Sequence, residues 1–160
     1  FENQDTNKVK LNIQNQTIND IKRRGGTKMI LFQKAPTKTL QKIVNREIRK
    51  VRRTVDRQLP EFQFCLDNGT SNDIVKEAKH LESFLCAKLD PWKEKIENAI
   101  QGCKDLQEAF VEQMYADPLL EDTIEAQYDR LSKEIVDLYK LEALRYSTEQ
   151  YVICCCKRFQ

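Results

Sequence analysis

The sequence predicts a mainly α-helical protein: an antiparallel bundle of three to four helices, preceded by an extended N-terminal arm that is irregular or weakly β. Charged residues make up 32% of the 160 residues and glycine occupies only 4 positions, a composition that favours helices over a turn-rich β fold. After residue 37, apolar residues recur at spacings of three and four. We therefore expect a basic arm over 1–37, a helical bundle over 38–150 and a cysteine-rich tail over 151–160.

The N-terminal arm lacks the helical period. Residues 9–13 alternate between apolar and polar side chains, which is typical of a half-buried strand, and a second apolar run covers 29–32. Between them, Gly25 and Gly26 can supply the positive φ that a tight turn requires. A β-hairpin and a disordered arm with two apolar segments both fit this pattern.

The first helix is predicted over 38–58, where apolar residues mark one helical face. Their spacings are four, four, three and four, and the residues are Leu40, Val44, Ile48, Val51 and Val55. Pro60 is expected to end this helix, because proline lacks the amide donor and disfavours the helical conformation in the residue before it. Residues 60–69 then form a connector with a turn at its end.

Three further helices are predicted over 72–89, 91–115 and 118–147. Ser71 or Asn72 can cap the first of them, and an Asp-Pro pair opens each of the other two, since aspartate caps free amides and proline fits the first helical position. The last two helices carry heptad seams, which are Trp92, Ile96, Ala99, Cys103, Leu106 and Phe110, then Leu120, Ile124, Tyr128, Leu131, Ile135 and Leu138. Short joints between such helices favour antiparallel neighbours.

The charge of the chain is split between its two parts. Residues 1–57 hold 15 Lys and Arg against 5 Asp and Glu, a net charge of +10, whereas residues 58–160 hold 12 against 20, a net charge of −8. The formal net charge of +2 therefore hides a strongly dipolar chain. Such asymmetry indicates an electrostatic contact, either with a partner or between the two parts.

The predicted helix over 38–58 is the best candidate for a binding site. Its cations are Lys42, Arg46, Arg49, Lys50, Arg52, Arg53 and Arg57. They can contact a polyanion, an anionic membrane surface or an acidic protein surface, including this chain's own acidic helices, or they can simply be a solvated outer face. Nucleic acid is disfavoured as the partner, because no aromatic residue for base stacking lies between Phe32 and Phe62.

The six cysteines are an even number, which suits a disulfide framework. The candidates are Cys65, Cys86, Cys103, Cys154, Cys155 and Cys156. Adjacent side chains in the C-terminal triple point in different directions. Its three thiols can therefore form disulfides with the other three cysteines and link the tail to the helices. Alternatively, the triple followed by Lys157 and Arg158 suggests S-acylation near a membrane, and buried free thiols or a zinc site are further options.

The even cysteine count and the start at Phe1 favour secretion, with a cytoplasmic, membrane-associated protein as the alternative. Asn15 and Asn68 lie in Asn-x-Thr sequons and are glycosylation candidates. No run of about 18 apolar residues is present, so no transmembrane span is expected.

Catalytic motifs are missing from the sequence, and we expect neither an enzyme nor a cofactor or metal. His80 is the one histidine, and the Glu77-to-His80 spacing resembles half of a di-iron element that needs a second histidine. The sequence therefore predicts a secreted, disulfide-stapled helical protein that acts by surface recognition, with the basic helix on a protein or polyanion partner. The alternative is an intracellular coiled-coil scaffold, acylated at the cysteine triple. The oligomeric state is left open.

Overall fold

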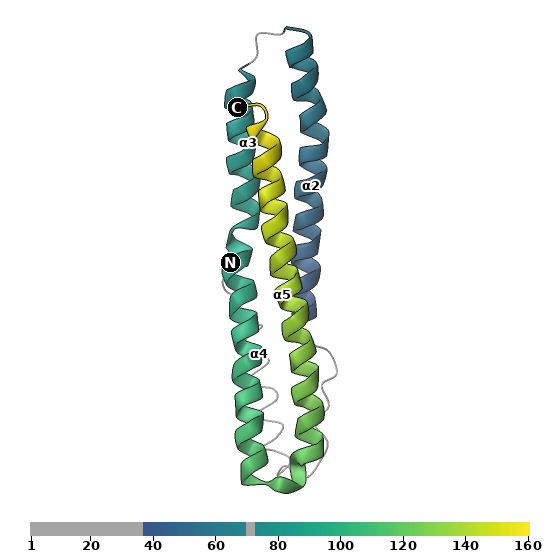
Figure 1. The fold of residues 1–160 in the computed structure, drawn as a ribbon, viewed down its shortest axis with the longest axis vertical. Helices are drawn as coiled ribbons and strands as arrows, with labels where there is room; N and C mark the ends of the chain where they lie inside the picture. Colours follow the sequence, from purple (N-terminus) through teal and green to yellow (C-terminus); the bar gives the residue numbers. More distant parts are fainter. Residues whose placement is uncertain (1–36, 70–72) are drawn as a thin grey trace. The chain divides into compact units, whose positions relative to one another are not determined.

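A computed structural model describes residues 37–69 and 73–160 of the chain. This part is helical and contains no strand (Figure 1), which confirms the predicted mainly α bundle of long helices. The elements are α2 (Thr37–Asp67), α3 (Ile74–Leu89), α4 (Pro91–Ala116), the short 3₁₀ helix η1 (Pro118–Leu120) and α5 (Glu121–Lys157). The predicted N-terminal hairpin or arm lies outside the described residues.

Helix α2 continues through Pro60, so the predicted helix end at that residue is wrong. Proline removes one backbone hydrogen bond, but the apolar face of α2 goes on beyond it, since Phe62 is buried. Burial of this face stabilises the last two turns more than one missing bond destabilises them. The helix ends at Asp67, and Gly69 follows with φ of 60°, the left-handed conformation that commonly terminates helices.

Helix α5 also runs further than predicted, to Lys157 instead of about residue 147. Val152 and Cys156 extend its buried face by another turn and are both 0% exposed. Residues 151–157 of the predicted cysteine-rich tail therefore belong to a helix, because their β-branched residues gain more from burial than they lose in helical propensity.

The described chain divides into two compact units, to which α2, α4 and α5 each contribute residues. The first unit comprises residues 37–41 and Glu94–Lys140, and the second comprises Lys42–Lys93 and Leu141–Gln160. The seam residues that belong to the first unit lie on α4, η1 and α5 and are buried, apart from Ile135 at intermediate exposure and the exposed Tyr128. Gln107 lies between these helices, where its amide donates to the Ser132 hydroxyl at 2.7 Å and to the Tyr128 carbonyl at 3.0 Å.

The core of the second unit contains the apolar faces of α2, α3 and the C-terminal part of α5, which lie side by side in Figure 1. Phe62 and Phe159 meet there edge to face, with ring centroids 5.6 Å apart. Ile74 and Ala78 of α3 pack against this pair. Trp92 belongs to the same unit and is 8% exposed.

Two aspartates begin helices as caps, and a third does not. Asp73 accepts a hydrogen bond from the Lys76 amide at 3.0 Å, and Asp117 accepts one from the Leu119 amide at 3.2 Å. The expected cap at Asp90 is not formed, because this residue has helical dihedrals and its own N–H donates to the Cys86 carbonyl. The cap of α3 is thus Asp73, not Ser71 or Asn72.

A buried arginine is part of α5 within the second unit. Arg145 is 1% exposed and forms a two-pronged ion pair with Glu142, at 2.7 and 2.8 Å, and a further bond to Glu149 at 2.8 Å. The hydrogen bonds to Glu142 favour the charged guanidinium and raise the pKa of Arg145 above its ordinary value. No helix in the described part of the chain is both long and apolar enough to span a membrane.

Candidate protein-binding surface on α2 and α3

Helix α2 separates its apolar and cationic residues as the sequence predicted. The five stripe residues from Leu40 to Val55 are between 0% and 4% exposed. Of the seven predicted binding cations, Arg52 is at intermediate exposure and six are exposed, namely Lys42, Arg46, Arg49, Lys50, Arg53 and Arg57. Residues 42–57 also hold two acids, Glu47 and Asp56, so the net charge of this segment is 7 − 2 = +5.

Arg52 differs from the other six because it packs against the chain itself. Its guanidinium lies 4.8 Å from the centre of the Tyr151 ring, and the Tyr151 hydroxyl donates to the Asp56 carboxylate at 2.7 Å. The bond to Asp56 raises the pKa of Tyr151 to about 12, because the carboxylate favours the protonated phenol. Arg52 thus joins α2 to α5 within the second unit.

One cation of α2, outside the seven predicted ones, acts on an acidic helix of this chain. Burial raises the pKa of Glu134 on α5, and the charge of Lys38 at the start of α2 opposes this rise. The ion pairs of Arg145, and the one between Lys157 and Glu82 at 3.8 Å, do not involve the seven predicted cations. Six of those seven are exposed and keep their charge facing outward.

A cationic groove of about 380 Å³ lies between α2 and α3. Lys50, Arg53 and Arg57 line it from α2, and Lys88 lines it from α3. Its remaining lining is Val51, Thr54, Phe84 and Leu85. Phe84 is 51% exposed, and the Lys88 ammonium lies 4.9 Å from the centre of its ring. The groove thus offers four positive charges beside one exposed aromatic ring, which suits a ligand that is both anionic and apolar.

The structure gathers three of the seven predicted cations in this groove and leaves Lys42, Arg46, Arg49 and Arg52 out of its lining. Sequence reasoning missed Lys88 and Phe84, which contribute a charge and the aromatic surface. Lys88 and Phe84 line the groove only because α3 packs beside α2. No local pattern in the sequence predicts which helices pack together.

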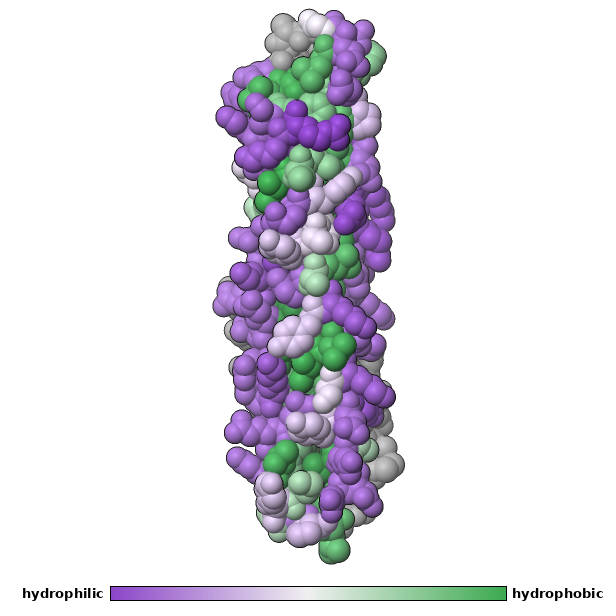
Figure 2. Space-filling view, viewed as in Figure 1, coloured by the Kyte–Doolittle hydropathy of each residue, from purple (hydrophilic) through white to green (hydrophobic). Residues whose placement is uncertain are grey.

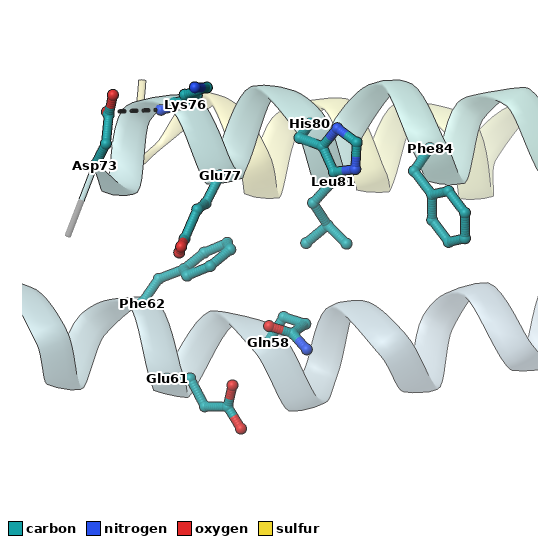
Figure 3. A pocket seen from close by; sticks show the side chains of 9 residues that line it. All are labelled: Gln58, Glu61, Phe62, Asp73, Lys76, Glu77, His80, Leu81 and Phe84. Atoms are coloured by element: carbon teal, nitrogen blue, oxygen red, sulfur yellow. Dashed lines mark hydrogen bonds between the residues drawn. The ribbon is translucent and has the colours of Figure 1, made fainter.

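A second groove, of about 750 Å³, also lies between α2 and α3, and we call it the Phe62 groove (Figure 3). Phe62 and Gln58 of α2 and Glu77, Leu81 and Phe84 of α3 point into the space between the helices. Its charged lining residues are Glu61, Asp73, Glu77 and Lys76, a net charge of 1 − 3 = −2. This groove is therefore apolar at its base and acidic at its edge.

His80 lines the Phe62 groove and is exposed. No group of three or more histidine, cysteine or acidic residues in residues 37–69 and 73–160 could hold a metal ion. The partial match of Glu77 and His80 to a di-iron element thus has no further ligands in the described chain.

Hydrophilic residues cover most of the face of the molecule in Figure 2, and hydrophobic residues reach that surface in separate patches. Apolar surface of this kind, broken up by hydrophilic residues, is ordinary on a protein. The feature that distinguishes α2 and α3 is the combination of Phe84 with a dense cationic lining.

The predicted disulfides are wrong. All six cysteines, Cys65, Cys86, Cys103, Cys154, Cys155 and Cys156, are free thiols, and no two sulfurs lie within 4.5 Å. Cys65 packs against the cluster of Phe62 and Phe159, and Cys103, Cys155 and Cys156 are buried. The helical stripes thus use these cysteines as small apolar side chains, and the disulfide-stapled binding protein is overturned together with the main support for secretion.

Burial keeps several of these thiols protonated. It raises the pKa of Cys103 to about 12, assisted by the nearby Glu134 carboxylate at 4.0 Å, and that of Cys156 to about 11. Burial also raises the pKa of Cys86. Cys154, in contrast, is the exposed member of the triple.

We expect iodoacetamide at pH 8 to label Cys154 first and Cys103 last in the native protein. At that pH about 10⁻⁴ of Cys103 is thiolate, given its pKa of about 12, and the side chain is 0% exposed. Peptide mass spectrometry measures the order. In urea without reductant all six cysteines should react, and resistance of any pair there would contradict the free thiols.

Of the two glycosylation candidates, Asn15 lies outside the described residues. Asn68 is exposed at the end of α2, and its side-chain amide donates to the Phe64 carbonyl at 2.8 Å. This bond helps to terminate α2, so the asparagine has a structural role in the helix end.

Comparisons with protein families, with curated proteins and with solved structures find no match to this chain. Its function therefore has to be inferred from the geometry and charge of the surface on α2 and α3.

Proposed function

We propose that this chain is a helical binding module that docks an acidic segment of a partner protein on the cationic surface of α2 and α3. The observation that supports this most is the cationic groove, where Lys50, Arg53, Arg57 and Lys88 surround the exposed Phe84. Side chains that combine positive charge with an aromatic anchor are typical of the centre of protein interfaces.

An acidic protein segment fits this groove better than a nucleic acid does. The Lys88 ammonium already occupies one face of the Phe84 ring, which leaves that face closed to a stacking base. A peptide needs no stacking platform, because its carboxylates can contact the cations while an apolar side chain contacts the ring edge.

The alternative, a coiled-coil scaffold that associates through the seams of α4 and α5, has less support. Ten of the twelve seam residues are buried within this chain, so most of that apolar surface is already covered. Its other element, acylation at the cysteine triple, concerns one exposed thiol, Cys154.

The test is binding of a glutamate-rich helical peptide to the full chain and to the triple variant Lys50→Glu, Arg53→Glu, Arg57→Glu. We expect the variant to weaken binding on the order of 100-fold, because three attractions become three repulsions. Raising the salt from 50 to 200 mM should weaken the wild-type complex on the order of tenfold. Fluorescence anisotropy measures both.

The matched control is Lys93→Glu, Lys133→Glu, Lys140→Glu, which changes the net charge equally at exposed lysines outside the groove. Equal losses in both triple variants would mean that only net charge matters and would overturn the proposal. Tighter binding of heparin or single-stranded DNA than of the peptide, at the same salt, would show a polyanion site instead.

A further inference from the structure

The two grooves between α2 and α3 follow one another along these helices and share one lining residue, Phe84; we call them together the trough. The cationic groove is lined from α2 by residues 50–57, and the Phe62 groove by residues 58–62. From Lys50 to Phe62 the trough follows 13 residues of α2, whose 12 steps of about 1.5 Å each span about 18 Å. An amphipathic helix of about 12 to 15 residues has this length.

The two ends of the trough carry opposite charge. Lys50, Arg53, Arg57 and Lys88 give the cationic groove a net charge of +4. Glu61, Asp73 and Glu77 against Lys76 give the Phe62 groove a net charge of −2. Figure 3 shows Asp73 at one end of the Phe62 groove and Phe84 at the other, where the cationic groove begins.

Apolar side chains follow one another along the trough. Phe62 comes first, Leu81 packs against the cluster that contains it, and Phe84 follows toward the cationic end. Because Phe62 is 5% exposed whereas Phe84 is 51% exposed, the accessible apolar contact is Phe84, near the middle. A helix lying in a groove uses an apolar anchor of this kind, and its charged residues set its register.

We propose that the trough binds an amphipathic partner helix with segregated charge: acidic side chains on the half against Lys50, Arg53 and Lys88, an apolar residue on Phe84, and basic side chains on the half against Glu61 and Glu77. This rests on the proposed function and adds the charge order of the partner. A uniformly acidic helix would bring its second half against the carboxylates of the Phe62 groove, which repels it.

The experiment compares three 15-residue helical peptides by fluorescence anisotropy on the full chain. The first has an acidic half, a central leucine and a basic half; the second has the same composition with the charges intermixed; the third is acidic throughout. We expect the first to bind at least about tenfold more tightly than the second, because only segregated charges meet complementary charges at both ends.

The variant Glu61→Lys, Glu77→Lys makes the test specific for the acidic end. Both glutamates are exposed, so the fold should tolerate the change. Binding of the segregated peptide should weaken about tenfold, whereas binding of the acidic peptide should tighten. The control Glu97→Lys, Glu108→Lys alters two exposed residues of α4 and should preserve the preference for the segregated peptide.

The contribution of the anchor is tested by Phe84→Ala, which should weaken the segregated peptide about tenfold, with Phe84→Leu restoring part of the affinity. Equal affinity for the segregated and intermixed peptides, or no effect of the acidic-end variant, overturns the charge order while leaving the proposed function intact. Failure of the acidic peptide to respond to the triple variant on α2 overturns the proposed function itself.

Discussion

Replacing Arg145 by methionine is expected to lower the free energy of unfolding by about 3 to 5 kcal/mol. The change removes the partner of two carboxylates, Glu142 and Glu149, whose side chains are only 21% and 20% exposed. Carboxylates left in such surroundings without a countercharge are strongly destabilising. Urea unfolding followed by circular dichroism measures the loss.

Two further variants separate the ion pairs from the packing of the arginine stem. Lys140→Met, an exposed residue of the same helix, should change the stability by less than about 0.5 kcal/mol. Adding Glu142→Gln and Glu149→Gln to Arg145→Met should recover much of the loss, because no carboxylate is then left without its countercharge. A loss below about 1 kcal/mol for Arg145→Met would show that water solvates these glutamates well enough on its own.

Phe62→Ala should destabilise the second unit by a similar amount, about 3 to 5 kcal/mol. The ring is 5% exposed and packs edge to face on Phe159, so its removal loses apolar burial and leaves a cavity. Phe64→Ala is the matched control, since that ring is 65% exposed only two residues away. Urea unfolding of both variants should show a large and a negligible effect respectively.

The aromatic contact itself can be measured with a double-mutant cycle of Phe62→Ala and Phe159→Ala. We expect a coupling free energy of about 0.5 to 1.5 kcal/mol, the range for aromatic pairs in this geometry. Strictly additive losses would mean that the two rings are buried side by side without a specific interaction. Equal destabilisation by Phe62→Ala and Phe64→Ala would contradict the assigned faces of α2.

The periodic parts of the chain could be predicted from sequence because their apolar faces repeat locally. The helices expected over 72–89 and 91–115 are observed as Ile74–Leu89 and Pro91–Ala116. The predicted end of α2 at Pro60 is wrong, because the rule that proline ends a helix takes no account of the stability gained when Phe62 is buried against the neighbouring helix. The position at which α2 ends depends on tertiary packing, which local sequence patterns do not predict.

For the cysteines and for the site, too, features that depend on neighbours in the sequence could be predicted, and features that depend on contacts between distant segments could not. The even cysteine count suggested disulfides, but a disulfide needs two sulfurs brought together by the fold, and this fold brings no two sulfurs within 4.5 Å of each other. The outward cations of α2 followed from the opposite stripe, whereas Lys88 and Phe84 entered the groove only through the pairing of α2 with α3.

The position of Trp92 gives the protein a built-in spectroscopic probe of one part of its fold. It is the only tryptophan of the 160 residues, and it lies buried in the second unit. Its emission therefore reports the surroundings of Trp92 at the start of α4, whereas far-ultraviolet dichroism reports every helix. Coincident transitions by the two signals would mean all-or-none unfolding of both units, and separated transitions would assign the tryptophan-monitored step to the unit that carries the trough.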